Sequence, residues 1–207
     1  GITHFPVVPA AFERLVERPD VSLGQVRTVY SAGAPLPDRV FAQAFDRLDT
    51  RIGQLYGATE FGSITFSDPH ADCFAPGMVG RPFAGVELQV ASGEAETDGE
   101  IKIAGPTLME RYFDEAEQTK RDWISSGDMG RIDESGCLWI TGRLKSLIDV
   151  GGAKVNPAEV ESVLRAHPSV RDCVVIGMKQ SACVERVCAM IELRDGAEAV
   201  SEHELRG

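Results

Sequence analysis

The chain has 207 residues, 43% hydrophobic and 26% charged, which is enough to bury one sizeable core and a smaller second one. Its formal net charge of −11, with no run rich in lysine or arginine, argues against nucleic acid and anionic membranes as partners. No stretch approaches the ~20 apolar residues of a membrane span, and the start lacks the pattern of a signal peptide, so we expect a cytoplasmic protein.

The first part of the chain alternates helices with strands that run into glycine loops. Hydrophobic spacing predicts a helix at "PAAFERLV" (9–16) and another at "DRVFAQAFDRL" (38–48). The residues expected on their buried faces are Phe12, Leu15 and Val16 in the first helix, and Val40, Phe41, Ala44, Phe45 and Leu48 in the second. The stretches "VRTVYSAGAPLP" and "RIGQLYGATEFG" each predict a short strand followed by a loop. This order is typical of an α/β layer fold, in which ligands collect where strands end.

From about residue 77 the pattern changes to short alternating runs separated by glycine. These runs predict antiparallel strands, and thus a β-rich segment attached to the α/β layer. The five cysteines contain no C-x-x-C pair, which favours buried or idle thiols over a disulfide framework or a zinc site.

After "TGRLK" the sequence predicts a small α+β unit. The stretch "SLIDVGGAKV" indicates a hairpin, and "NPAEVESVLRAHP" a helix capped by Asn156, with Val160, Val163 and Leu164 buried. Two strand-like runs, "VRDCVVIGM" and "VERVCAMIEL", follow. The final "SEHELRG" has the spacing of a capping box and predicts the start of another helix.

The loop "QLYGATEFG" (54–62) carries residues that suit a nucleotide and its metal. Its glycines let the backbone approach a ligand, and Tyr56 can stack on a flat ring. Thr59 can donate to a phosphate oxygen, and Glu60 can hold magnesium. Taken alone, the stretch is better explained as a turn in which Thr-Glu starts a helix.

Four further motifs occur along the chain in one order. They are "SAGAPLP" (31–37), "GEIKIAGPTLMERYF" (99–113), "WISSGDMG" (123–130) and "GRLKSLIDVGGAKVNPAEVE" (142–161). Together with the loop at 54–62, this ordered set resembles the acyl-adenylate-forming enzymes, which include acyl-CoA synthetases, peptide-synthetase adenylation domains and luciferases. The resemblance covers the whole chain. It implies that a parent protein uses ATP to convert a carboxylate into an acyl-adenylate and then transfers the acyl group to a thiol.

The resemblance also implies roles for the loop at 54–62. Tyr56, beside Gly57, would stack on adenine, and Thr59 would contact the α-phosphate region. Glu60 would ligate magnesium, so Thr59 and Glu60 are the expected catalytic residues.

Two other parts of the nucleotide site follow from the resemblance. Gly33, Ala34 and Pro35 would form a loop that passes between adenine and the acyl group, approaching through the backbone. Asp128 would accept the ribose hydroxyls, assisted by Arg143. In isolation, Asp128 would be an ordinary turn aspartate and Arg143 a surface cation.

The thiol step is expected to involve the small domain. The resemblance implies the C-terminal part of a large domain over 1–142 and a small domain over 143–207, which rotate about a hinge near 143–146. Lys145 occupies the hinge position, where acyl-CoA synthetase-like members tend to have lysine, so CoA is the expected acceptor. Gly152 would line the pantetheine tunnel, or be an ordinary hairpin glycine. Lys154 would meet a CoA phosphate, or be a solvated lysine with no such role.

The acyl pocket is the least defined part of the expected site. The stretch "THFPVVP" resembles a strand at this pocket, so His4 and Phe5 are candidates to face the acid, although a histidine on an apolar strand is more often a core residue.

Two family elements have no counterpart in these 207 residues: the phosphate loop and a lysine near the C-terminus. We therefore expect the chain on its own to adenylate poorly.

The sequence departs from the family pattern at two positions. Arg111 stands where the family has a small residue, and Ser126 replaces a threonine while keeping the hydroxyl.

One alternative function is a ligase that loads a carrier protein through its phosphopantetheinyl arm. The other is a non-catalytic module that binds a nucleotide or an acyl group.

Overall fold

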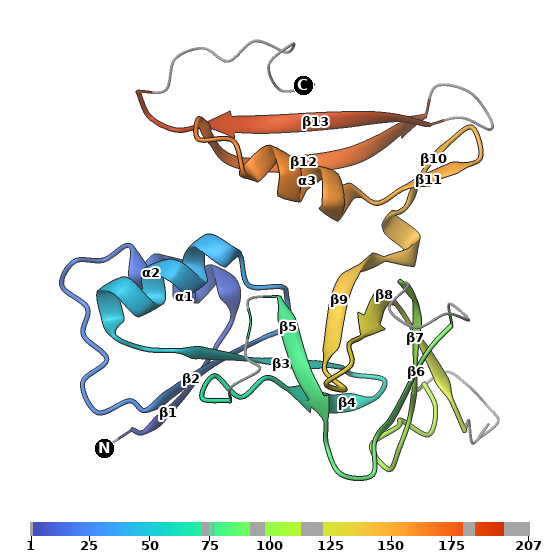
Figure 1. The fold of residues 1–207 in the computed structure, drawn as a ribbon, viewed down its shortest axis with the longest axis horizontal. Helices are drawn as coiled ribbons and strands as arrows, with labels where there is room; N and C mark the ends of the chain where they lie inside the picture. Colours follow the sequence, from blue (N-terminus) through green and yellow to red (C-terminus); the bar gives the residue numbers. More distant parts are fainter. Residues whose placement is uncertain are drawn as a thin grey trace. The chain divides into compact units, whose positions relative to one another are not determined.

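The computed structural model describes residues 2–71, 75, 77–91, 98–112, 122–179 and 185–196 (Figure 1). The chain divides into two compact units. The first comprises residues 1–126 and 130–140, and the second comprises residues 127–129 and 141–207. The helix expected at "SEHELRG" lies outside the described residues.

The first unit begins as an α/β layer, as the sequence predicts. Strands β1 (His4–Val7), β2 (Thr28–Ala32) and β3 (Ile52–Ala58) pair in parallel. Helix α1 (Pro9–Val16) connects β1 to β2, and α2 (Asp38–Leu48) connects β2 to β3. Both helices lie on the same side of these strands in Figure 1. The carboxyl ends of the three strands therefore meet at one edge of the sheet.

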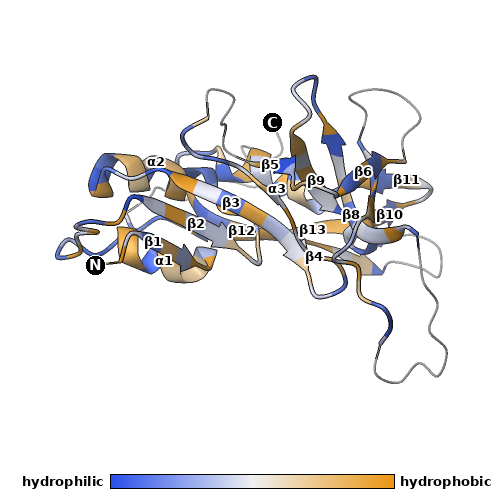
Figure 2. Cartoon of the chain, turned by 90° about the horizontal axis from the view of Figure 1, so that it is seen from below, coloured by the Kyte–Doolittle hydropathy of each residue, from blue (hydrophilic) through white to orange (hydrophobic). Residues whose placement is uncertain are grey.

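The two helices pack on the sheet through one hydrophobic cluster. Its buried members are Phe12, Val16, Val29, Leu36, Val40, Phe41, Ala44 and Ile52. A side-chain ion pair between Glu13 and Arg39 joins the helices on their polar side. Figure 2 shows that each helix carries both hydrophobic and hydrophilic residues, as packing on one face requires.

The prediction that Phe45 is buried is wrong. Its side chain is 54% exposed, and the guanidinium of Arg51 lies 6.0 Å from the centre of its ring. The apolar stripe of α2 is wider than the surface that the sheet covers, so the residue at its margin stays in solvent.

The sheet continues beyond β3 with antiparallel strands. Its order is β1-β2-β3-β4-β5-β9-β8-β7-β6. The added strands are β4 (Gly62–Phe66), β5 (Met78–Pro82), β6 (Glu87–Val90), β7 (Gly99–Ala104), β8 (Ile124–Ile132) and β9 (Leu138–Arg143). The expected β-rich segment is thus confirmed, and it extends the sheet of the α/β layer. A second cluster, which includes Ile64, Ile101, Ile103 and Leu138, forms its core.

The second unit has the expected α+β content. It contains the short helix η1 (Leu144–Ser146), the hairpin strands β10 (Ile148–Val150) and β11 (Ala153–Val155), and helix α3 (Pro157–Arg165). Strands β12 (Val170–Lys179) and β13 (Glu185–Leu193) form an antiparallel pair. The core of this unit consists of Ile148, Leu164, Val170, Cys173 and Val175.

One residue on α3 departs from the prediction. Val163 is 74% exposed, whereas Val160 and Leu164 pack in the core of the unit. Residues four apart share a helix face, and Val163 is rotated about 100° from Leu164, which places it on the solvent side.

The described cysteines are free thiols, as predicted. Cys137 and Cys173 are buried, and Cys188 is partly exposed. Within the described part of the chain, no helix combines the length and apolar character needed to cross a membrane.

Candidate functional site

The carboxyl ends of β2 and β3 bring two of the predicted nucleotide contacts to one edge. Ala32 pairs with Leu55 at the end of the parallel register, so Gly33 leaves β2 beside Tyr56. Gly33, Ala34 and Pro35 are exposed, and Gly33 has a φ of +90°, a conformation that favours glycine. A ligand at this edge would therefore meet an accessible backbone on one strand and an aromatic ring on the next.

The stretch 54–62 is a strand followed by a tight turn, and not a single loop. Tyr56 belongs to β3, where its ring packs 5.8 Å from that of Phe61. A Cβ atom on Gly57 would lie 2.3 Å from the carbonyl oxygen of Gly62. The close pairing of β3 with β4 therefore requires glycine at this position, whether or not a ligand approaches.

The turn that carries Thr59 and Glu60 is held by a distant segment. The backbone N–H of Met109 donates to the Glu60 carbonyl at 2.9 Å, and Thr107 Oγ1 donates to the Phe61 carbonyl at 2.7 Å. The hydroxyl of Tyr112 donates to Glu60 Oε1 at 3.1 Å. The motif at 99–113 thus reaches the turn at 54–62, and orients the carboxylate expected to bind magnesium. In the sequence, Tyr112 was recognised only as part of the motif at 99–113, and no role was assigned to it.

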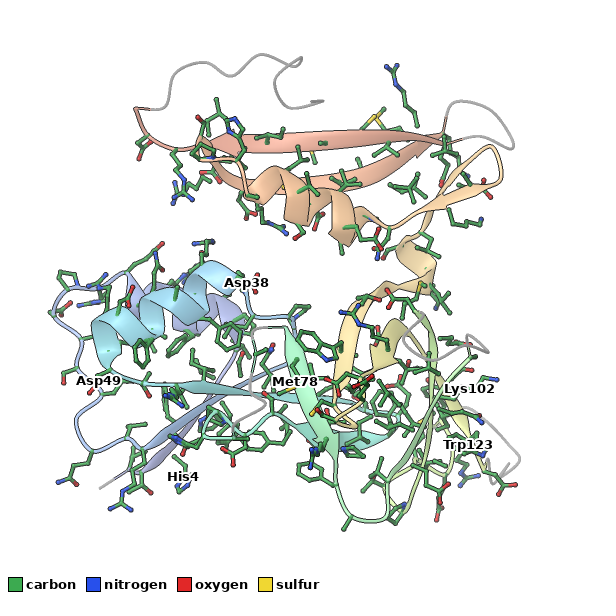
Figure 3. The ribbon with its side chains drawn as sticks, viewed as in Figure 1. His4, Asp38, Asp49, Met78, Lys102 and Trp123 are labelled. Carbon is green, nitrogen blue, oxygen red and sulfur yellow. The ribbon has the colours of Figure 1, made fainter. Side chains whose placement is uncertain are left out.

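Gln54 is a second residue that sequence reasoning missed. Its side chain is buried in β3, 4% exposed. Oε1 accepts from the backbone N–H of Leu36 at 3.3 Å, and Nε2 donates to the Met78 carbonyl at 3.2 Å. Met78, labelled in Figure 3, lies on β5. Gln54 therefore ties the loop after β2 to the centre of the sheet. In the sequence, the only indication of this role was a polar residue between two apolar positions of the predicted strand.

In the second unit the structure pairs Asp128 with Arg143. Arg143 Nε donates to Asp128 Oδ1 at 2.9 Å. The side chain of Asp128 is 10% exposed and that of Arg143 is 74% exposed. The carboxylate is therefore held in place by a cation that stays in solvent, which is a suitable arrangement for accepting hydrogen bonds from ligand hydroxyls.

Asn156 fixes the strand that carries Arg143. Its Oδ1 accepts from the N–H of Ala158, which confirms the predicted helix cap. Its Nδ2 donates to the Thr141 carbonyl at 2.8 Å and to Glu159 Oε1 at 3.2 Å. A Cβ atom on Gly142 would lie 2.7 Å from this amide, so glycine at 142 makes room for the cap. The cap thus also positions the end of β9.

The residues expected at the hinge and the CoA site lie in two adjacent elements. Lys145 is exposed in η1. Gly152 lies in the β10–β11 turn, and Lys154 lies on β11, where its Nζ donates to Asp149 Oδ2 at 2.6 Å. Lys154 is therefore paired with a carboxylate of its own hairpin.

The two acyl-pocket candidates occupy neighbouring positions of β1. Phe5 packs against the cluster beneath α1 and α2, whereas His4 is exposed with its ring nitrogen 3.0 Å from Thr3 Oγ1. The interpretation of His4 as a core histidine is wrong. Successive strand residues point to opposite faces, so these two side chains do not share one face of the sheet.

The turn between β8 and β9 contains a perturbed carboxylate. Asp133 accepts from the N–H of Cys137 at 2.9 Å and from Trp139 Nε1 at 2.8 Å. Burial alone would raise the pKa of Asp133. Hydrogen bonds from Trp139 and from the backbone N–H groups of Cys137 and Ser135 outweigh burial and hold this pKa below its usual value.

Comparison with protein families matches both units. Residues 1–113 match the family described as AMP-binding enzyme, and residues 159–207 match the AMP-binding enzyme C-terminal domain.

Curated relatives and solved structures agree with this match. A fatty acid–[acyl-carrier-protein] ligase, ScoC, of Streptomyces coeruleorubidus is 34% identical over 95% of this chain and 41% of its own. 4-Coumarate–CoA ligase 1 of Glycine max is 32% identical over 99% of this chain and 76% of its own. ATP-bound MatB from Rhodopseudomonas palustris superposes with a TM-score of 0.87 at 31% identity, covering 98% of this chain and 43% of MatB. The chain thus spans about two fifths of the carrier-protein ligase and of MatB.

Proposed function

Because the chain belongs to the family of AMP-binding enzymes, we propose that its parent protein is an ATP-dependent ligase that joins a carboxylic acid to CoA. The observation that carries the proposal is the Asp128–Arg143 pair. A nearly buried carboxylate held by an exposed arginine presents acceptor oxygens to two adjacent ribose hydroxyls. The relatives named as CoA and carrier-protein ligases support the same reaction class.

The reaction begins with an acid that is a poor electrophile. Its carboxylate oxygen attacks the α-phosphorus of ATP, the bond to the β-phosphate oxygen breaks, and pyrophosphate leaves with the electron pair. Positioning and charge neutralisation supply most of the catalysis in such phosphoryl-type substitutions. In this proposal Tyr56 stacks on adenine, the backbone at Gly33–Pro35 lies between adenine and the acyl group, and Thr59 donates to an α-phosphate oxygen.

Magnesium would bind beside Glu60. Among the described residues, no three His, Cys, Asp or Glu side chains gather into a metal-binding group. In this proposal Glu60 supplies the protein's carboxylate ligand. One carboxylate combined with substrate phosphates is the usual environment of magnesium in nucleotide sites. The Tyr112 hydroxyl donates to one carboxylate oxygen of Glu60, and this hydrogen bond would orient Glu60 for binding the ion. When bound, the ion would neutralise charge on the phosphates.

The second step transfers the acyl group to a thiol. The thiol sulfur attacks the acyl carbon, AMP leaves, and the thiol proton passes to solvent. We assign this step to the β10–β11 hairpin, with Gly152 beside the pantetheine arm and Lys154 near the acceptor phosphates. Lys145 in η1 is the proposed hinge for the change between the two steps, and favours CoA as the acceptor.

A carrier protein is the second candidate acceptor. The observation that favours it is the identity of 34% to ScoC, which is named as a fatty acid–[acyl-carrier-protein] ligase. CoA and a carrier protein present the same phosphopantetheinyl thiol, so the hairpin would meet the same chemical group in both cases.

The test measures the two steps separately on the parent protein. Pyrophosphate–ATP exchange is assayed with a panel of carboxylic acids, and we expect one acid to stimulate exchange strongly. Transfer is then assayed with that acid and either free CoA or a phosphopantetheinylated carrier protein. If no acid stimulates exchange while ATP still binds, the protein is a non-catalytic nucleotide-binding module and the proposal is wrong.

A further inference from the structure

The turn of the β10–β11 hairpin has a backbone conformation that favours glycine. Gly151 has a φ of +65° and Gly152 a φ of +99°, both in the left-handed region. A Cβ atom at either position would meet nothing within 4 Å, so crowding does not explain the two glycines. Such a turn has considerable conformational freedom unless another group restrains it.

The carboxylate of Asp149 supplies that restraint. Oδ1 accepts from the backbone N–H of Gly152 at 2.7 Å, and Oδ2 accepts from Lys154 Nζ at 2.6 Å. Asp149 and Lys154 face each other in the antiparallel register. The Asp149 carboxylate therefore contacts both the opposite strand and the turn. These two hydrogen bonds hold the pKa of Asp149 below its usual value.

Asp149 is itself held by the sheet of the second unit. Its backbone N–H donates to Glu185 Oε2 at 2.9 Å, and Glu185 begins β13. Gly177 on β12 leaves room for this carboxylate, since a Cβ atom there would lie 3.1 Å from Glu185 Oε2. The neighbouring Ile148 is buried in the core of the unit. The hairpin is thus anchored at its base and restrained at its turn.

We propose that Asp149 is a positioning residue for the thiol-transfer step, which acts by setting the Gly151–Gly152 turn and directing Lys154. The proposal rests on the proposed ligase function, in which Gly152 lies beside the acceptor's pantetheine arm. An acceptor that must pass a backbone turn loses affinity and alignment when the turn samples many conformations. In the proposed mechanism, adenylation uses none of these groups.

The test compares three hairpin variants of the parent protein. Asp149→Ala removes both restraints, and we expect KM for CoA to rise about tenfold, the effect of losing one charge-assisted hydrogen bond. Asp149→Asn keeps an acceptor for the Gly152 N–H but loses the ion pair, so its effect is smaller. Lys154→Met keeps the carboxylate on the turn and removes the proposed phosphate contact, so its effect measures the contribution of the lysine alone.

Pyrophosphate–ATP exchange is measured in the same preparations. We expect exchange within twofold of wild type in both Asp149 variants, which also shows that they are folded. Glu192→Gln is the control, because it removes an exposed carboxylate partner of Arg171 on the same unit and should change neither assay.

The outcomes separate the two proposals. If wild-type protein shows no acid-dependent exchange, the ligase function fails. If exchange and transfer are both normal in Asp149→Ala, the ligase function stands and the positioning role is wrong. Equal loss of exchange and transfer in Asp149→Asn would also overturn the role, because it would indicate general damage to the fold.

Discussion

Arg143 Nε lies 2.9 Å from Asp128 Oδ1, and these two residues stand on neighbouring strands, β9 and β8. The acceptor is nearly buried and the donor is largely exposed. Their contributions to ligand binding should therefore differ. Removal of the buried carboxylate takes away the proposed acceptor for the ribose hydroxyls, whereas removal of the arginine takes away a group that orients this carboxylate.

Replacement of Asp128 should weaken ATP binding more than replacement of Arg143. Asp128→Ala in the parent protein should raise the dissociation constant about 10- to 100-fold, as expected for a lost hydrogen bond to a charged group. Arg143→Ala should have a smaller effect, and the double variant should fall short of the sum of the two. Calorimetric titration with ATP gives the constants, with Arg171→Ala as a control. Strict additivity would contradict a coupled pair.

Gln54 should stabilise the first unit through its two hydrogen bonds. Gln54→Leu leaves the Leu36 N–H and the Met78 carbonyl without this partner, and should lower the free energy of unfolding by about 1–3 kcal/mol. Urea denaturation measures the change. Gln89→Leu on the exposed side of β6 is the matched control and should stay within about 0.5 kcal/mol of wild type. Equal effects of the two variants would show that the buried amide makes no special contribution.

Two glycines near the carboxyl ends of β2 and β3 should respond differently to alanine. Gly57→Ala would place a methyl group 2.3 Å from the Gly62 carbonyl oxygen, so β3 and β4 must separate, at a cost of about 1–3 kcal/mol. Gly33→Ala meets no atom within 4 Å and costs only the strain of its φ of +90°, about 1 kcal/mol. Thermal unfolding of the two variants should show the larger loss for Gly57→Ala. The reverse order would argue against the tight β3–β4 pairing.

Asp133 should make stability depend on pH in the acid range. Because its folded pKa lies below the unfolded value of about 3.9, its stabilising effect is fully present above that value. The effect is lost as the pH falls through the lower folded pKa. Trp139→Phe removes one donor, so it should flatten the decline of melting temperature between about pH 5 and pH 2. Trp123→Phe is the control for loss of an indole, and an unchanged slope in Trp139→Phe would contradict this account.

Much of the secondary structure followed from local patterns. The helices at 9–16 and 38–48, the hairpin after "TGRLK" and the Asn156 cap were all predicted from the sequence. Hydrophobic period and turn chemistry act within a few residues, so they can be recognised without knowledge of the fold. The exposure of Phe45 and Val163 could not, because it depends on how much of each helix the sheet covers.

The sequence by itself determined the candidates for the chemistry: an aromatic, a hydroxyl and a carboxylate at 56–60, and Asp128 with Arg143 in ordered motifs. Only the tertiary structure decided what holds them. Gln54 reaches Leu36 and Met78 across 18 and 24 positions of the chain, and Tyr112 reaches Glu60 across 52. Such contacts depend on strand order and register, which bring distant segments together, and local propensities carry no information about either.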